Sequence, residues 1–301
     1  MPSAMGTSAE WSSQRICGCF GAELQLYTAG KEGPLLAALP GGQQGAHGLR
    51  GSLPGQIASA AHKRSRFRLL SMDRVNCTGS SSLCFSPGVP EAELHAEHLL
   101  DALRSACSAS NHPHAGFALI GSSSGARVCL IAAHRFPSEV ACVVACDPST
   151  FPEIVAGAYY DVHVASAKSH GLRNGVALSN FYQEIARHNP GAPEQLERCD
   201  VDAFIRFMEQ SSTFIRSHAP AVEGVPVNAG LSAEGAQALT TPVLVCHSSQ
   251  LDDQLHPQSA SRALAKLIPS CQECIVSSGP EGIGINGLLE RSLMFIEEHV
   301  R

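Results

Sequence analysis

A serine between two glycines lies where a predicted strand runs into a predicted helix. The sequence Gly121-Ser122-Ser123-Ser124-Gly125 follows the apolar run 116–121 and precedes the helix-like run 126–134. In a strand–turn–helix of this kind, the glycines permit a tight bend that exposes the central hydroxyl near a helix N-terminus, where negative charge is favoured. Ser123 is therefore the candidate nucleophile, and the backbone amide of Ser124 is a candidate oxyanion donor. The alternative is a serine-rich loop without chemistry.

A second glycine-rich turn follows an earlier apolar strand. The run Leu39-Pro40-Gly41-Gly42-Gln43-Gln44-Gly45 would let backbone amides approach a ligand, because glycine has no side chain to block them. Gly42 is the first candidate for the second oxyanion donor, and Gln43 is the next. An ordinary glycine turn is the rival interpretation.

Strands alternate with helices along most of the chain. Short apolar or alternating runs predict strands, and apolar residues at helical spacing predict helices between them. The predicted strands include residues 23–28, 34–40, 67–73, 116–121, 140–146, 242–247 and 273–278. This alternation predicts an α/β fold with a mostly parallel central sheet flanked by helices.

The chain is expected to form one domain with an insertion. Its 301 residues, 44% of them hydrophobic, suit a single large core better than two independent ones. Residues 1–20 lack periodicity and are predicted to be a poorly ordered N-terminal segment. Residues 21–150 and 241–301 are assigned to the α/β core. Residues 151–240 are mostly helical and are assigned to an inserted helical cap over the carboxyl ends of the strands.

These segments together resemble the α/β-hydrolase superfamily from about Glu23 to the C-terminus. The run 39–42 resembles the oxyanion loop of that family. The run 73–80 resembles its D-R-x-G-x-G-x-S turn, with Asn76 and Thr78 in place of glycines. The run 133–140 resembles the stretch between the helix after the nucleophile and the next strand. The resemblance implies a capped hydrolase that uses a serine nucleophile.

The resemblance also implies a triad in the chain order nucleophile, acid, histidine, with the acid after the strand at 243–246. Asp253 is preferred, because the spacing in Asp253-Gln254-Leu255-His256-Pro257 resembles the acid loop of the family. Asp252 beside it is an alternative acid. Asp147, at the end of the preceding strand, is another. A solvated acidic turn is the rival interpretation.

The terminal histidine of the family is not found. The loop at 279–287 contains no histidine, and His299 lies too far along the last predicted helix to reach the serine. His256, on the acid loop, could act as a displaced base, or it could simply pack with Pro257 at the start of a helix. His47 is a weaker candidate. The choice matters because a serine hydroxyl without a base is a weak nucleophile.

Composition excludes several classes of function. With 21 basic and 27 acidic residues the net charge is -6, and the absence of a long basic run argues against a nucleic-acid partner. No apolar stretch reaches the roughly 20 residues of a membrane helix, and the N-terminus has no signal pattern. The sequence thus predicts a cytoplasmic protein that acts on a small molecule and has no membrane partner.

The 12 cysteines are expected to be reduced. Several lie in apolar runs, where a thiol behaves as a small hydrophobic group. The pair Cys271 and Cys274 has the spacing of a redox or zinc motif, but it lacks a second pair of ligands at a suitable distance. We therefore expect neither a metal ion nor another cofactor.

Two classes of function fit these observations. The first is a serine hydrolase that acts on an ester, lactone or similar carbonyl substrate through an acyl-enzyme on Ser123. The second is a non-catalytic protein of the same fold that binds a ligand or a partner and lacks a complete triad. A cofactor-free lyase or perhydrolase-like reaction is a third idea without residue evidence. The substrate and the oligomeric state stay open.

Overall fold

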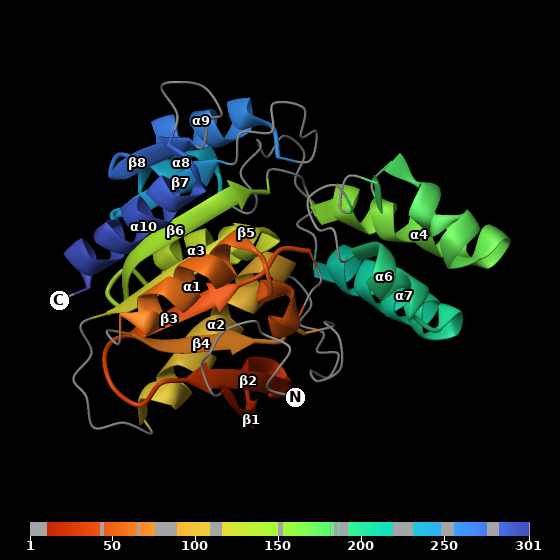
Figure 1. The fold of residues 1–301 in the computed structure, drawn as a ribbon, viewed down its shortest axis with the longest axis horizontal. Coiled ribbons are helices and arrows are strands. Elements are labelled where there is room, and N and C mark those ends of the chain that lie inside the picture. The colour runs from red at the N-terminus through yellow and green to blue at the C-terminus, as the bar shows by residue number, and fades with distance from the viewer. Residues whose placement is uncertain are drawn as a thin grey trace.

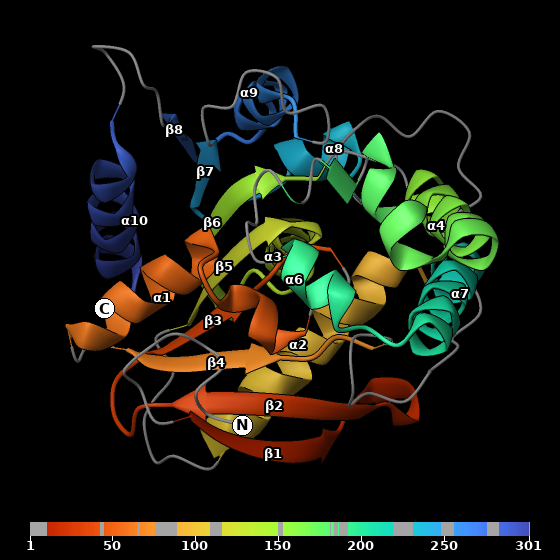
Figure 2. The same cartoon turned by 45° about the vertical axis from the view of Figure 1, so that its right-hand side comes forward.

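The described part of the chain in this computed structural model is arranged around one eight-stranded sheet. Figure 2 shows the strands in the order β1-β2-β4-β3-β5-β6-β7-β8. The structure describes residues 11–42, 45–64, 67–75, 89–108, 116–149, 153–180, 182–183, 186, 192–218, 231–247, 256–275 and 283–300. The strands are β1 (Trp11–Cys17), β2 (Glu23–Ala29), β3 (Leu35–Leu39), β4 (Arg68–Met72), β5 (Phe117–Ser123), β6 (Val140–Pro148), β7 (Val243–His247) and β8 (Cys271–Ile275).

Strand β2 pairs antiparallel with β1 and with β4, whereas all pairings from β4 to β8 are parallel. Parallel strands need long crossovers, and helices supply them here. The predicted α/β fold with a mostly parallel sheet and flanking helices is confirmed.

The inner strands are apolar on both sides, which explains why they read as continuous apolar runs. Neighbouring residues of a strand point to opposite faces. Leu119 packs on the face covered by α2 (Glu91–Ser108), α3 (Ser124–Arg135) and α9 (Gln258–Leu267). Ile120 packs on the face covered by α1 (Leu53–Lys63) and α10 (Ile285–His299). The sheet thus forms the middle of three layers.

Strands β3 and β5 are neighbours whose connections leave on opposite faces of the sheet. The chain continues from β3 into α1 and from β5 into α3, and these two helices cover different faces. Such a switch point separates the loops at the carboxyl ends of the two strands and is where open α/β sheets bind ligands. The two glycine-rich turns singled out in the sequence leave β3 and β5 at this point.

Strand β1 is a correction to the predicted poorly ordered segment at 1–20. Its residues pair with all of β2, and Ser12 and Thr28 share a hydrogen bond of 2.8 Å between their hydroxyls. Arg15 forms an ion pair with Glu23. Most of this edge strand is exposed, so it carries no apolar alternation from which a strand could be predicted. Residues 1–10 lie outside the described residues.

The described helices between β6 and β7 are α4 (Glu153–Asn174), η4 (Val176–Leu178), α6 (Ala192–Glu197), α7 (Val201–His218) and α8 (Ala233–Gln237). Figure 1 shows α4, α6 and α7 together, beyond the arrowhead of β6. In contrast, α8 contributes Ala236 to the core against the sheet. The assignment of 151–240 as an inserted helical cap stays a prediction.

Two short 3-10 helices, η2 (Cys19–Gly21) and η3 (Ala46–Leu49), complete the described elements. No helix in the described ranges has the length and apolar character needed to cross a membrane.

Candidate active site

Ser123 lies in a strained bend between β5 and α3. Its backbone angles are φ 52 and ψ -122, a conformation that costs a residue with a side chain about 1–3 kcal/mol. The bend leaves the side chain half-buried next to the N-terminus of α3. Proteins retain this kind of strain where it positions a functional group, so the predicted strand, turn and helix are joined in a way that suits a nucleophile.

The two glycines of the G-x-S-x-G pattern are needed for close packing. A Cβ atom on Gly121 would lie 2.4 Å from the carbonyl carbon of Gly125, and a Cβ atom on Gly125 would lie 2.5 Å from the carbonyl oxygen of Pro40. Both separations are far below van der Waals contact. The first glycine lets α3 turn back over β5, and the second lets α3 approach the loop after β3.

His256 reaches the serine directly. Its Nε2 atom lies 2.9 Å from Oγ of Ser123, although 133 residues separate the two in sequence. With Nε2 unprotonated, the hydroxyl donates to the ring, which is the arrangement of a nucleophile and its general base. His256 comes directly before Pro257, the N-cap of α9. It therefore lies at the start of a helix, as the packing alternative predicts, and also contacts the serine.

The other two candidate histidines differ in their positions. The Nδ1 atom of His299 lies 2.8 Å from the carbonyl oxygen of Phe295, so this ring is bonded to its own helix, α10. His47 belongs to η3, but its side chain is outside the described part of the structure. Among the described histidines, His256 is therefore the one that shares a hydrogen bond with Ser123.

The loop after β3 contacts the bend at Ser123. A Cβ atom on Gly41 would lie only 2.7 Å from Cβ of Ser123, so the loop backbone can come this close because residue 41 is glycine. Gly42 has φ 59, the left-handed region that glycine tolerates best. The hydroxyl of Ser124 donates to the carbonyl oxygen of Gly42 over 3.0 Å. The structure thus brings together Gly42 and Ser124, whereas Gln43 lies outside the described residues.

The candidate acids are only partly described. Asp252 and Asp253 lie outside the described residues, although His256, three positions after Asp253, is described. Asp147 is the residue before the last in β6 and lies next to the bend, since Ser123 is opposite Pro148 in the pairing of β5 with β6. Like the serine, Asp147 has a positive φ, of 43.

Asp147 is paired with a buried histidine that the sequence analysis missed. Nδ1 of His247 lies 3.2 Å from Oδ1 of Asp147 and 3.3 Å from Oγ of Ser261. His247 is almost completely buried at the carboxyl end of β7. A histidine that ends an otherwise apolar strand, at the edge where the other candidates meet, is the signal that could have identified it.

The buried carboxylate of Asp73 binds the start of η3, the short helix that follows the loop after β3. Oδ1 of Asp73 accepts a hydrogen bond of 2.7 Å from the amide of Ala46, and Oδ2 accepts one of 3.2 Å from the hydroxyl of Tyr27. Burial, with a smaller effect of the Asp73 charge, raises the pKa of Tyr27 to about 12. This part of the D-R-x-G-x-G-x-S-like turn therefore ties β2, β4 and η3 together, while Asn76 and Thr78 are outside the described residues.

The cysteine pair on β8 does not form a site. Cys271 packs against the core on one face of the sheet and Cys274 on the other, because residues three apart in a strand point to opposite sides. Burial raises the pKa of Cys271 to about 11. No cluster of three or more potential metal ligands is found among the described residues.

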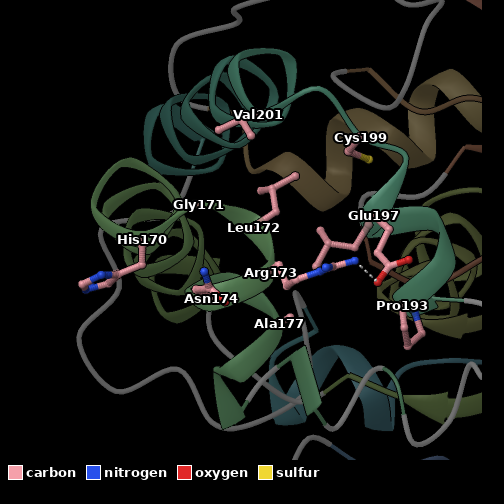
Figure 3. Close-up of a pocket in the computed structure, with 11 residues that line it drawn as sticks. His170, Gly171, Leu172, Arg173, Asn174, Ala177, Pro193, Glu197, Cys199 and Val201 are labelled. Atoms are coloured by element: carbon pink, nitrogen blue, oxygen red, sulfur yellow. Dashed lines mark hydrogen bonds and ion pairs between the residues drawn. The ribbon is translucent and has the colours of Figure 1, made fainter.

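A cavity of about 400 Å³ lies among α4, η4, α6 and α7. Figure 3 shows Arg173 and Glu197, which form an ion pair of 2.9 Å, with Leu172 beside them. None of the described residues that line this cavity is a candidate catalytic residue. In the described part of the chain, the cavity is therefore separate from the bend at Ser123.

A family model agrees with the fold. The model described as alpha/beta hydrolase fold matches residues 46–281, a span that contains Ser123, Asp147 and His256. A comparison with curated proteins gives no match.

Several solved structures are similar over nearly their whole length. An esterase from Thermogutta terrifontis is 19% identical with a TM-score of 0.59, and the match covers 95% of this chain and 97% of that one. The enol-lactonase from Burkholderia xenovorans LB400 is 16% identical with a TM-score of 0.63, covering 94% and 100%. An esterase from Rhodococcus sp. ECU1013 is 18% identical with a TM-score of 0.65, covering 96% and 99%. At these identities the similarity shows the fold alone.

Proposed function

Because the chain belongs to the alpha/beta hydrolase fold family, we propose that it is a serine hydrolase that cleaves an ester, a lactone or a similar small carbonyl substrate. The observation that carries the proposal is the 2.9 Å separation between Nε2 of His256 and Oγ of Ser123, at a serine whose backbone is strained. A fold alone would not suffice, since members of one fold differ in function.

The proposed reaction begins with Ser123. As Oγ attacks the carbonyl carbon, its proton passes to Nε2 of His256. The carbonyl oxygen becomes an oxyanion, which accepts hydrogen bonds from the backbone amides of Ser124 and Gly42. When the tetrahedral intermediate collapses, the carbon–oxygen bond to the alcohol breaks and His256 returns the proton to the leaving oxygen. The acyl group is then an ester on Ser123.

Deacylation repeats these steps with water. His256 takes a proton from a water molecule, whose oxygen attacks the acyl carbon. The second tetrahedral intermediate collapses, the bond to Ser123 breaks, and His256 gives the proton back to the serine oxygen. The products are a carboxylic acid and an alcohol, or a single hydroxy acid if the substrate is a lactone. No cofactor takes part in the proposed reaction.

A carboxylate is expected to orient His256 by accepting a hydrogen bond from its Nδ1. Asp253 is our first assignment, because it stands on the same loop as His256. Asp147, which lies beside the bend but is paired with His247, is the alternative.

The chemistry of the bend and the comparisons support the proposed substrate class. Two of the similar structures are named as esterases and one as an enol-lactonase, and each name describes that protein. An activated ester or lactone suits an acyl-enzyme route, because its leaving group departs as an alkoxide that one histidine can protonate.

A non-catalytic protein that binds a ligand or a partner is the second candidate. It is favoured by the absence of a histidine from residues 279–287, where this family places the base. The contact between His256 and Ser123 is what makes an enzyme the better proposal.

Labelling with a fluorophosphonate distinguishes the two candidates. The probe phosphonylates a serine only when a base activates it and donors stabilise the oxyanion. We expect the wild-type protein to be labelled at Ser123, identified by peptide mass spectrometry, and the Ser123→Ala variant to be unlabelled. A folded wild-type protein that takes up no label would overturn the hydrolase proposal and favour the binding protein.

A further inference from the structure

The guanidinium of Arg74 is buried against Ser124 and Gly42, the two residues whose amides are the candidate oxyanion donors. Only 1% of the residue is exposed. Nη1 donates to Oγ of Ser124 over 3.1 Å. Nη2 donates to the carbonyl oxygens of Pro40, over 3.3 Å, and of Gly42. All of these acceptors are neutral oxygens in the loop after β3 or at the first residue of α3.

No carboxylate balances this charge within the described residues. The ion pairs of the described structure do not include Arg74, and its Nε is buried without a hydrogen-bond partner there. A buried charge without a counter-charge is costly. An arginine at this place is therefore better explained by what it holds in position than by a gain in stability.

The contacts close a ring that joins the two loops of the switch point. Oγ of Ser124 accepts from Arg74 and itself donates to the carbonyl oxygen of Gly42 over 3.0 Å. Gly42 in turn accepts from Arg74. Each of the three groups thus contacts the other two. Ser124 follows the candidate nucleophile directly, so the ring fixes the loop after β3 relative to Ser123.

The loop needs such an anchor because it is made of glycine. Gly41 and Gly42 have the largest intrinsic backbone freedom of any residues, and Gly42 stands at φ 59. Peptide groups are planar, and Arg74 holds the carbonyl oxygens of Pro40 and Gly42, so it fixes the peptide planes on both sides of the one that contains the amide of Gly42. An oxyanion hole works well only when its donors are held in place before the reaction.

We propose that Arg74 is a positioning residue, which holds the loop at residues 40–42 against Ser124 and thereby sets the geometry of the oxyanion hole. This inference rests on the proposed hydrolase function. Arg74 acts through Ser124 and Gly42 and does not contact the substrate. Its loss should slow formation of the tetrahedral intermediate while leaving substrate binding nearly unchanged.

The test compares Arg74→Lys with Arg68→Lys. Arg68 begins the strand that Arg74 follows, and it also donates to backbone carbonyl oxygens, of Gly33 over 3.1 Å and of Ala106 over 3.4 Å, but at the amino end of β4. Lysine keeps the positive charge at both positions and loses the fork of donors. The two variants therefore make the same chemical change at opposite ends of one strand.

The readouts are the rate of fluorophosphonate labelling at Ser123 and kcat and KM for p-nitrophenyl acetate. We expect Arg74→Lys to lower the labelling rate and kcat by about 10-fold or more with KM changed less than about 3-fold. Arg68→Lys should leave all three close to wild type. Ser124→Ala, which removes the middle of the ring, should lower kcat in the same direction and decides the matter if Arg74→Lys does not fold.

The outcomes separate the two proposals. A wild-type protein without labelling contradicts the hydrolase function itself. A labelled wild-type protein whose folded Arg74→Lys and Ser124→Ala variants react at the wild-type rate contradicts the positioning role. A rise in KM with unchanged kcat contradicts it as well, because Arg74 would then act on substrate binding.

Discussion

The Oγ atom of Ser123 lies 2.9 Å from Nε2 of His256, a histidine that precedes α9 instead of following the last strand of the sheet. The proposed base and the preferred acid, Asp253, therefore both lie in the segment between β7 and α9. Because β7 pairs with β6 and β6 with β5, β7 lies two strands away from β5, yet His256 contacts the bend at the end of β5.

Replacing His256 by glutamine should abolish most of the activity. Glutamine keeps the size of the side chain and a polar group near Ser123, but it cannot take the proton, and a general base contributes about 100- to 10,000-fold. We therefore expect His256→Gln to lower kcat/KM for p-nitrophenyl acetate by at least about 100-fold. His299→Gln is the matched control, since His299 is bonded to Phe295 on its own helix. Equal activity of the two variants would rule out His256 as the base.

Two substitutions decide which carboxylate orients the base. Loss of the acid from a serine triad lowers kcat by about 10,000-fold. We expect Asp253→Asn to cause a loss of this order and Asp147→Asn to keep most of the activity, because Asp147 already pairs with His247. Steady-state kinetics with p-nitrophenyl acetate measures both, and thermal unfolding checks that each variant is folded. The reverse ranking would assign the acid to Asp147.

The turn at Ser123 was predictable because its signal is local. Two glycines at fixed positions, an apolar run before them and a helical pattern after them specify one bend, and the structure forms it with φ 52 at the serine. The inner strands could also be predicted from the sequence, because burial on both faces requires continuous apolar runs. Strand β1 could not be predicted in this way, because it is held by pairing with β2 at an exposed edge.

The contacts between the loops depend on the fold and not on any single segment. The sequence placed His256 on the acid loop but could not decide between a base and a residue that packs at a helix start. That choice depends on where the connection after β7 lies relative to β5. Arg74 was recognised only as part of a family-like turn, and its burial under the loop at 40–42 follows from the neighbouring positions of β3 and β4 in the sheet.

Relieving the strain at Ser123 should stabilise the protein. Glycine adopts a positive φ without the steric cost of about 1–3 kcal/mol that alanine or serine carries, although it loses up to about 1 kcal/mol through the greater freedom of the unfolded chain. We therefore expect Ser123→Gly to be more stable to urea than Ser123→Ala by about 1 kcal/mol. Both variants lack the nucleophile, so the comparison isolates the backbone. A Ser123→Ala variant that is the more stable of the two would mean that the bend is not strained.

A buried histidine away from the site should make stability depend on pH. His98 of α2 is fully buried, its Nε2 lies 3.2 Å from the carbonyl oxygen of Cys19, and its Nδ1 is buried without a partner in the described structure. Burial lowers the pKa of His98 below the ordinary value of 6.5, against smaller raising effects of Cys19 and Asp101. The ring of His98 therefore binds a proton less readily in the folded protein than in the unfolded chain.

The sign of the pH dependence follows from that direction. As the pH falls below 6.5, the unfolded chain binds a proton that the folded protein does not, so the free energy of unfolding decreases until the lowered pKa is reached. Carboxylates titrate near pH 4, so urea unfolding between about pH 7 and pH 5.5 reports mainly on histidines.

We expect His98→Gln, which can still donate to Cys19, to lose less stability over this interval than the wild type. His163 also has a pKa lowered by burial, so part of the loss should remain in His98→Gln and become smaller in the double variant with His163→Gln. Identical slopes for the wild type and His98→Gln would show that protonation of His98 is not linked to unfolding.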